Sequence, residues 1–291
     1  MRFGVTFPQT EIGTDPARIR DFFQAVEGLG YDFVTLPEHV LGAGSSPHDD
    51  WRTYYTRDNA FHEPFVLYGF AAALTSRLEL ATAILVLPQR QAVLAAKQAA
   101  ELDMLSGGRV RLGVGLGWNA VEFEALGEDF ANRGRRLAEQ VEVMRSLWSN
   151  ELTTFRGEWH TLSDVGLNPM PVQRPIPVWV GAFQAPAVRR AARIGDGWIM
   201  NPRMRPEDLA RDIATFRGAA EGAGRDPAAL GLEATVWAHE GGAEDWRRRI
   251  EQWRQHGVSH ITFRTMQSGL DADAHVGKLE DFAPAMADFR S

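Results

Sequence analysis

The stretch of sequence that decides the fold runs from Arg77 to Gly117 and reads RLELATAILVLPQRQAVLAAKQAAELDMLSGGRVRLGVGLG. Its first apolar run, Leu78–Leu87, lacks the alternation of apolar and polar residues that a strand with one solvent-exposed face would show. It fits a strand that is buried on both faces, as in a parallel sheet. A second run, Val110–Gly115, ends in glycines, which let a ligand approach the backbone closely. The stretch therefore predicts a β-α-β unit with a ligand site at the exit of its second strand.

The segment between these two runs predicts the helix of that unit. Its expected apolar stripe is formed by Val93, Ala96, Ala100 and Met104. Ser106-Gly107-Gly108 predicts the helix end, because glycine readily takes the left-handed conformation found at helix C-termini. Parallel α/β proteins build ligand sites at the C-terminal ends of their strands. We therefore expect the functional residues just after the predicted strands.

Eight segments of the chain read as buried strands. They are Arg2–Phe7, Asp32–Leu36, Leu78–Leu87, Val110–Gly115, Pro177–Gly181, Gly197–Met200, Leu232–Val236 and Ser259–Phe263. Helical patterns separate most of them, and Asp15-Pro16 and Pro206 each predict a helix start. This alternation predicts one α/β domain, residues 1–291, folded as a closed (β/α)8 TIM barrel with rim insertions. A doubly wound open sheet shares the alternation and is the alternative.

Two insertions interrupt the alternation of strands and helices. The first, residues 41–63, is rich in Gly, Ser, Asp, His and aromatic residues. The second, residues 150–176, contains Phe155–Trp159, which predicts a small hairpin. Loops of this length are either functional lids or loose connections, and both interpretations of the first insertion stay open.

Composition restricts the class of protein. Hydrophobic residues make up 44% of the chain, enough for a large core. The net charge of −7 disfavours a nucleic-acid partner, which would more often bind a basic protein. The chain has no cysteine, which excludes disulfides and thiol catalysis and fits a cytoplasmic protein. We expect neither a signal segment nor a membrane span.

Two strand exits carry the residues best suited to chemistry. Glu38-His39 follows the second predicted strand, and a histidine there can donate or accept a proton near neutral pH. Gly181-Ala182 precedes a predicted helix that begins near Pro186, and exposed amides at a helix N-terminus can hold a phosphate. The glycines of the fourth strand lack the spacing of a dinucleotide-binding loop, and no metal-binding or nucleophile motif is present, so we predict no metal site.

Several segments in combination resemble a known family. They are Leu102–Arg109 leading into Leu112–Gly117, then Arg133–Trp148, then Val178–Gly181 with Ala192–Trp198. In this order they resemble the bacterial luciferase-like superfamily, and particularly its coenzyme F420-dependent oxidoreductases. The resemblance extends from Arg2 to about Asn201 and is only general after that.

The resemblance implies a (β/α)8 barrel that binds a flavin or deazaflavin across its C-terminal face. Cofactor contacts are implied for Glu38, for a cis peptide at Ala83-Ile84, for Gly115 and Gly117, and for the phosphate-binding turn at Gly181 and Ala182. Glu38 is also implied as a catalytic residue beside His39, which we expect to donate or accept the proton. Expected substrate contacts are Trp51, Tyr54, Tyr55, Phe61 and Trp118. Trp118 stands where sugar-phosphate dehydrogenases of the family have a catalytic glutamate, which argues against that reaction.

The resemblance leaves the cofactor open. With F420 the protein would transfer hydride to or from a small organic substrate. With FMN it would be a monooxygenase that uses O2 and reduced flavin, supplied by a separate reductase. A basic rim would favour the acidic tail of F420, and Arg52, Arg57 and Arg90 are candidates. A barrel of another enzyme class and a cofactor-binding protein without catalysis are further alternatives. The resemblance also implies a homodimer.

Overall fold

The computed structural model describes residues 1–42, 44 and 55–290 of the chain. Its nine sheet strands are β1 (Arg2–Thr6), β2 (Phe33–Leu36), β3 (Glu79–Thr82), β4 (Leu85–Val86), β5 (Val110–Gly115), β8 (Val178–Gly181), β9 (Gly197–Ile199), β10 (Gly231–Trp237) and β11 (His260–Arg264). They pair in the order β3-β2-β1-β11-β10-β9-β8-β5-β4, and the pairing of β3 with β5 closes the sheet. All eight predicted strands are present, and the closure confirms the barrel over the open sheet.

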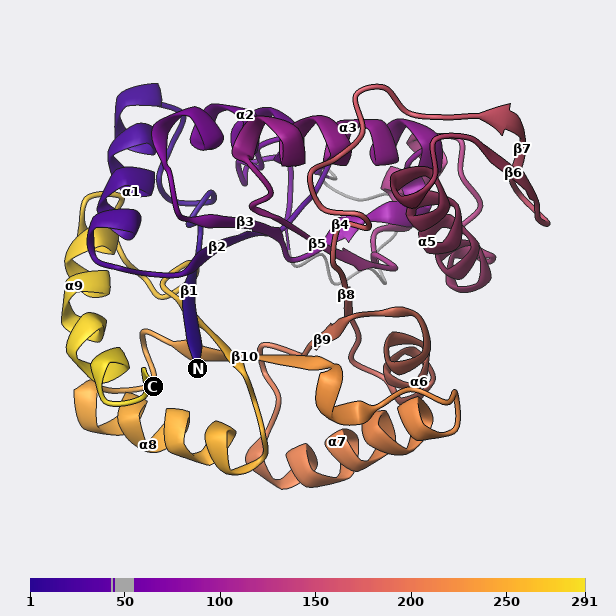
Figure 1. Cartoon of the computed structure of the whole chain (residues 1–291). Coiled ribbons are helices and arrows are strands. Elements are labelled where there is room, and N and C mark those ends of the chain that lie inside the picture. The colour runs from indigo at the N-terminus through magenta and orange to yellow at the C-terminus, as the bar shows by residue number, and fades with distance from the viewer. Residues whose placement is uncertain (43, 45–54, 291) are drawn as a thin grey trace.

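Helices surround this barrel, as Figure 1 shows. They are α1 (Pro16–Gly28), α2 (Pro64–Leu74), α3 (Ala92–Ser106), α4 (Ala120–Ala125), α5 (Arg133–Ser149), α6 (Ala185–Ile194), α7 (Pro206–Glu221), α8 (Ala243–Gln255) and α9 (Ala274–Ala287). Two short 3-10 turns, Leu87–Gln89 and Pro227–Ala229, complete the set. The predicted helix starts are confirmed. Asp15 caps α1 by accepting a hydrogen bond from the Ala17 amide at 3.0 Å, and Pro206 opens α7. Among the described helices, none combines the length and the apolar character needed to cross a bilayer.

The third barrel strand is divided into two pieces. The sequence predicts one continuous strand, Leu78–Leu87, but the peptide between Ala83 and Ile84 is cis and separates β3 from β4. β3 pairs with β2, while β4 pairs with β5. The cis peptide expected from the family resemblance is therefore present, and it lies at the C-terminal end of the barrel.

The buried face of α3 differs from the predicted stripe. Ala96 and Ala100 are fully buried, but Val93 is 44% exposed and Met104 is only half-buried. The face that packs inward is instead lined by small residues, because α3 lies between α2 and α5 and helix backbones approach closely there. Large apolar side chains are exposed on α2 and α3. They are Val66, Phe70, Val93, Leu94 and Leu105.

The second insertion forms the predicted hairpin, from β6 (Thr153–Arg156) and β7 (Thr161–Val165). It lies along α5: the Glu139 carboxylate accepts hydrogen bonds from three consecutive backbone amides of the hairpin, at 2.7 to 2.9 Å. The hairpin follows α5 and precedes β8, so the chain enters and leaves it at the N-terminal ends of the strands. It therefore does not cover the end where the strands exit.

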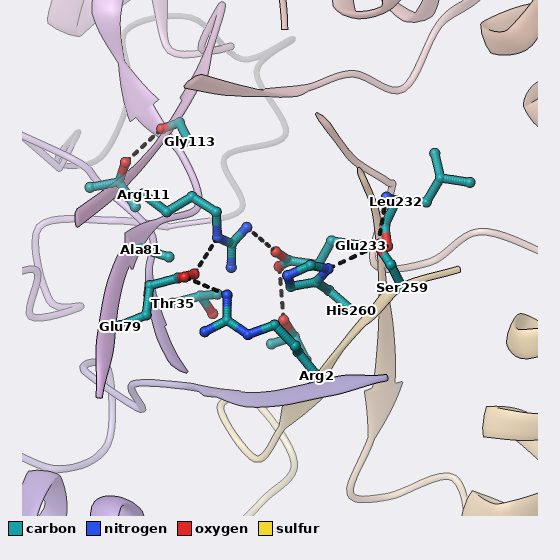
Figure 2. Close-up of polar contacts among 12 residues, drawn as sticks. Arg2, Thr35, Glu79, Ala81, Arg111, Gly113, Leu232, Glu233, Ser259 and His260 are labelled. Carbon is teal, nitrogen blue, oxygen red and sulfur yellow. Dashed lines mark hydrogen bonds and ion pairs between the residues drawn. The ribbon is translucent and has the colours of Figure 1, made fainter. Parts of the chain in front are cut away.

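The N-terminal end of the barrel interior contains a network of charges with Arg111 and Glu233 buried at its centre (Figure 2). The Arg111 guanidinium lies between two carboxylates, at 2.6 Å from Glu79 and 2.5 Å from Glu233. Arg2 binds Glu79 from the other side, also at 2.6 Å. His260 lies beside this network, and burial lowers its pKa from 6.5 to about 3. In a barrel, residues at this end serve stability, while the opposite end carries the chemistry.

Candidate functional site

The Glu38 side chain fixes the strand that follows the cis peptide. It is 3% exposed, and its carboxylate accepts a hydrogen bond of 2.6 Å from the Val86 amide in β4. Arg90 donates to the same carboxylate from Nε at 2.8 Å and from Nη2, and it also reaches Glu63 at 2.8 Å. Burial raises the pKa of Glu38, and the Arg90 guanidinium opposes that rise. The structure thus places Glu38 as a support for β4 and the cis peptide.

His39 is held by a carboxylate that the sequence did not point to. Its Nδ1 atom lies 3.2 Å from both carboxylate oxygens of Glu122, in α4. The same carboxylate accepts hydrogen bonds from the Val40 and Leu41 amides, at 2.8 and 3.0 Å. Nothing in the segment AVEFEA distinguishes Glu122 from Glu124, although Glu122 is buried and Glu124 is exposed. Hydrogen bonding to this carboxylate places a proton on the Nδ1 atom of His39.

Three aromatic rings surround His39. The ring centroids of Tyr55, Phe61 and Trp118 lie 5.2, 4.8 and 5.2 Å from the His39 ring. Tyr55 and Phe61 also contact each other, with ring centroids 4.8 Å apart. The structure therefore brings three of the predicted substrate contacts together around the predicted proton carrier. The other two, Trp51 and Tyr54, lie outside the described residues, as does Arg52.

An apolar surface lies where three neighbouring strands end. Ile84 is half-buried, and its side chain extends over Gly115 at the end of β5 and Gly181 at the end of β8. A Cβ atom on Gly115 would stand 2.8 Å from the Ile84 side chain, and one on Gly181 would stand 2.7 Å from it. Only glycine leaves room for Ile84 in this position, so the cis peptide and the two glycines form one apolar floor.

The turn after β8 leads into an uncapped helix. The Ala182 amide donates to the Ile199 carbonyl at 3.3 Å, so it is occupied within the sheet. Gln184 occupies the N-cap position of α6 but makes no side-chain capping hydrogen bond. The amides of the first turn of α6 are therefore the better anion donors in this segment. Gly117 has a φ of +68°, so the chain after β5 turns away through a conformation that favours glycine.

Two of the three arginines suggested for a basic rim, Arg57 and Arg90, are paired with carboxylates. Arg90 is neutralised by Glu38 and Glu63, and Arg57 lies 3.7 Å from Asp58. These carboxylates remove the unpaired positive charge that an acidic ligand would need.

A different group of arginines lies between α5 and α6. Arg190 extends to the first turn of α5, where its Nη2 atom would stand 2.8 Å from a Cβ on Gly134. Burial lowers the pKa of Arg190, and the positive charges of Arg193 and Arg133 lower it further. Among the described residues, no carboxylate lies within ion-pair distance of these three side chains, which we call the α5–α6 arginine cluster. Such a cluster suits an anionic ligand.

No metal centre is indicated in the part of the chain that the structure describes, because no three His, Asp or Glu side chains there converge as ligands. The candidate site comprises the aromatic rings around His39, the His39–Glu122 pair and the apolar floor.

Comparison with known proteins adds three findings. Residues 1–288 match the model of a family described as luciferase-like monooxygenase. An uncharacterized protein of Mycobacterium tuberculosis is 35% identical over 253 residues, which cover 84% of this chain and 85% of that protein. The F420-dependent hydroxymycolic acid dehydrogenase of the same organism is 30% identical over 259 residues, 86% of this chain and 66% of that protein.

One solved structure shows how far the fold is shared. An F420-dependent secondary alcohol dehydrogenase in complex with an F420-acetone adduct superposes with a TM-score of 0.81. The two chains are 20% identical, and the match covers 100% of this chain and 99% of that one. At this identity the likeness concerns the barrel fold.

Proposed function

This chain belongs to the luciferase-like monooxygenase family, and we propose that it is an oxidoreductase that uses coenzyme F420 for hydride transfer to or from a small organic substrate. The observation that carries the proposal is the apolar floor formed by Ile84, Gly115 and Gly181 at the C-terminal end of the barrel. A half-buried aliphatic side chain over two glycines supports a flat ring, because a Cβ at either glycine would displace it. The residues present therefore fit a tricyclic redox ring.

Helix α6 and its contact with α5 offer sites for the polar parts of the cofactor. The uncapped first turn of α6 would hold the phosphate. The α5–α6 arginine cluster would hold the carboxylates of the acidic tail that F420 has and FMN lacks. This unpaired positive charge is the reason for preferring F420, and the F420 dependence of the hydroxymycolic acid dehydrogenase agrees with that preference.

The chain's own catalytic contribution centres on His39. When bound, the deazaflavin supplies hydride chemistry, and the protein supplies orientation and proton transfer. Glu122 holds the Nδ1 proton of His39, so Nε2 can accept a proton from a substrate hydroxyl or, once protonated, return it to a carbonyl oxygen. Tyr55, Phe61 and Trp118 keep water away from that exchange. A homodimer and a separate reductase stay predictions.

Titration of the purified chain with F420 and FMN, each oxidised and reduced, tests the proposal. We expect roughly micromolar affinity for F420 and roughly millimolar affinity for FMN. The opposite ranking would assign the protein to the flavin-dependent monooxygenases of its family. Turnover assays with secondary alcohols and ketones, followed through the absorbance of F420, then test whether the protein is a catalyst.

A further inference from the structure

The last residue of β11, Arg264, carries a buried guanidinium. It is 9% exposed, and no carboxylate among the described residues lies within ion-pair distance of it. Its Nη2 atom makes only long hydrogen bonds, 3.4 Å to the Tyr55 hydroxyl and 3.5 Å to Gln267 Oε1. Its Nε atom is buried and has no hydrogen-bond partner in the described part of the chain. A buried charge of this kind is unfavourable unless something pairs with it.

The other buried arginines of the described chain show how the fold usually meets this need. Arg111 is 3% exposed and lies between Glu79 and Glu233. Arg136 is 8% exposed and pairs with Glu128. Arg264 departs from this pattern, and it does so at the C-terminal end of a barrel strand, where ligands bind.

Nearby charges compensate Arg264 only in part. The negative charge of Glu11 raises the pKa of Arg264, but Glu11 makes no ion pair with it. The Glu11 Oε1 atom accepts a hydrogen bond from the Gln267 amide at 2.9 Å, and its Oε2 atom is buried with no hydrogen-bond partner among the described residues. Arg203, after β9, adds a second positive charge, and none of the described carboxylates pairs with it. Burial lowers the pKa of Arg264, and Arg203 lowers it further.

Arg264 also lies beside the wall that carries the proposed proton transfer. The Tyr55 hydroxyl contacts the guanidinium, while the Tyr55 ring lies 5.2 Å from the ring of His39. On the other side, the guanidinium carbon lies 4.9 Å from the centroid of Trp237. Trp237, Gln267 and Arg203 are among the residues that line a cavity of about 740 Å³. Contacts between neighbouring side chains thus link His39 to Tyr55, Tyr55 to Arg264, and Arg264 to Trp237, which lines the cavity.

We propose that Arg264, with Arg203 beside it, binds an anionic group of the substrate, so that the substrate is an organic acid or a phosphate ester. A carboxylate or phosphate accepts strong hydrogen bonds from a guanidinium and would supply the negative charge that no described carboxylate provides. Arg264 contacts the hydroxyl of Tyr55, and His39 contacts its ring. The anionic group would therefore lie at one end of the substrate and the reacting carbon at the other. That the anion belongs to a redox substrate rests on the proposed function; the anion site itself does not.

Binding of small oxyanions to the cofactor-free full chain tests the site. We would titrate inorganic phosphate and acetate, with chloride at equal ionic strength as the reference, and follow the melting temperature and the heat of binding. The wild type should show a saturable rise in melting temperature. In Arg264→Met the affinity should fall by about tenfold or more, as expected for the loss of hydrogen bonds to a charged group. Arg217→Met, an exposed arginine on α7, is the matched control and should behave as the wild type.

The melting temperature of Arg264→Met without ligand separates a binding role from a structural one. Removal of an unpaired buried charge should leave the melting temperature unchanged or raise it, whereas removal of a structural arginine would lower it. If this variant does not fold, Arg264→Lys replaces it, because lysine keeps the charge but cannot donate two parallel hydrogen bonds. Phosphate binding by the variant as tight as that of the wild type, or no saturable binding by the wild type, would overturn the inference.

Repetition of the phosphate titration on F420-loaded protein distinguishes the substrate from the cofactor as the source of the anion. Unchanged phosphate affinity supports the substrate. Complete competition by F420 would assign Arg264 to the cofactor and refute the proposed substrate class. If neither F420 nor FMN binds but phosphate still requires Arg264, the anion site stands and the proposed function falls.

Discussion

His39 and Glu122 are 83 residues apart in the sequence, yet the His39 Nδ1 atom lies 3.2 Å from both carboxylate oxygens of Glu122. The carboxylate is 1% exposed and the histidine side chain 9% exposed, so the pair is shielded from water. Two backbone amides after His39 bind the same carboxylate. The pair therefore fixes both the ring orientation and the tautomer of the histidine, and the chain after β2 is tied to α4.

Glu122→Gln should leave cofactor affinity nearly unchanged and lower kcat by about 10- to 100-fold, because an amide can no longer fix the Nδ1 proton. Steady-state kinetics with F420 and cofactor titration are the measurements. Glu124→Gln changes an exposed glutamate of the same helix and is the control. A drop in cofactor affinity equal to the drop in kcat would indicate a structural role for Glu122 instead.

His39→Ala should retain cofactor binding and lose about 10²- to 10⁴-fold in turnover, the usual contribution of a general acid or base. Fluorescence titration and stopped-flow hydride transfer measure the two quantities separately. His256→Ala, at the end of α8, provides a histidine control remote from the site. Turnover by His39→Ala at the wild-type rate would remove the role assigned to His39.

Gly181→Ala should weaken cofactor binding by about tenfold or more, because the added Cβ would stand 2.7 Å from the Cγ2 atom of Ile84 and push this side chain into the ring site. Gly28→Ala is the control: nothing lies within 4 Å of a Cβ there, and alanine favours the helix. Isothermal titration calorimetry with F420 compares the two variants. Equal affinity in both would argue against Ile84 as the floor of the ring site.

Arg190→Met should weaken binding of F420 by about tenfold while leaving the affinity for FMN within about twofold, because only F420 carries the carboxylate tail. Arg189→Met removes an exposed neighbour that does not reach the α5–α6 arginine cluster and should change neither affinity. F420 preparations with longer glutamate tails should show the larger effect. Loss of FMN affinity by the same factor would assign Arg190 to the phosphate.

Acid should destabilise the folded chain through two histidines, the buried His275 and the half-buried His260. Burial lowers the pKa of His260 from 6.5 to about 3 and that of His275 from 6.5 to about 4. Below pH 6.5 the unfolded chain therefore binds more protons than the folded chain, and the free energy of unfolding falls as the pH falls. Each histidine contributes a slope of about 1.4 kcal/mol per pH unit between these pKa values.

Urea unfolding measured from pH 7 down to pH 4 checks this dependence. His260→Gln and His275→Gln should each flatten the slope, while His256→Gln should not. The same slope in the wild type and in both variants would contradict the assignment.

The barrel itself could be predicted from the sequence because its signals are local. Strands that are buried on both faces read as continuous apolar runs, and the run Val110–Gly115 matches β5 without error. Asp15 and Pro206 mark helix starts through their own backbone preferences. The C-terminal end of β2 could also be predicted as a functional position, because in a (β/α)8 barrel the functional residues lie at the C-terminal ends of the strands.

Other features depend on contacts with residues that are distant in the sequence. Arg90 is a candidate for a basic rim because arginine is positively charged, but Glu38 and Glu63 neutralise it. The sequence predicts one continuous strand, Leu78–Leu87, but a cis peptide between Ala83 and Ile84 divides it into two. Val93 has the spacing of the predicted helical stripe but is exposed, because the helices beside α3 pack against its alanine residues instead.

The amino-acid sequence by itself determined the eight strands, the helix starts and the end of the barrel at which chemistry occurs, since each follows from hydrophobic burial and backbone preference within a few residues. Only the tertiary structure decided which charges are paired: Glu122 with His39, Glu38 with Arg90, and Arg264 with no carboxylate of the described chain. Charge pairing depends on distances through space and on burial, and neither quantity is written in the local pattern of residues.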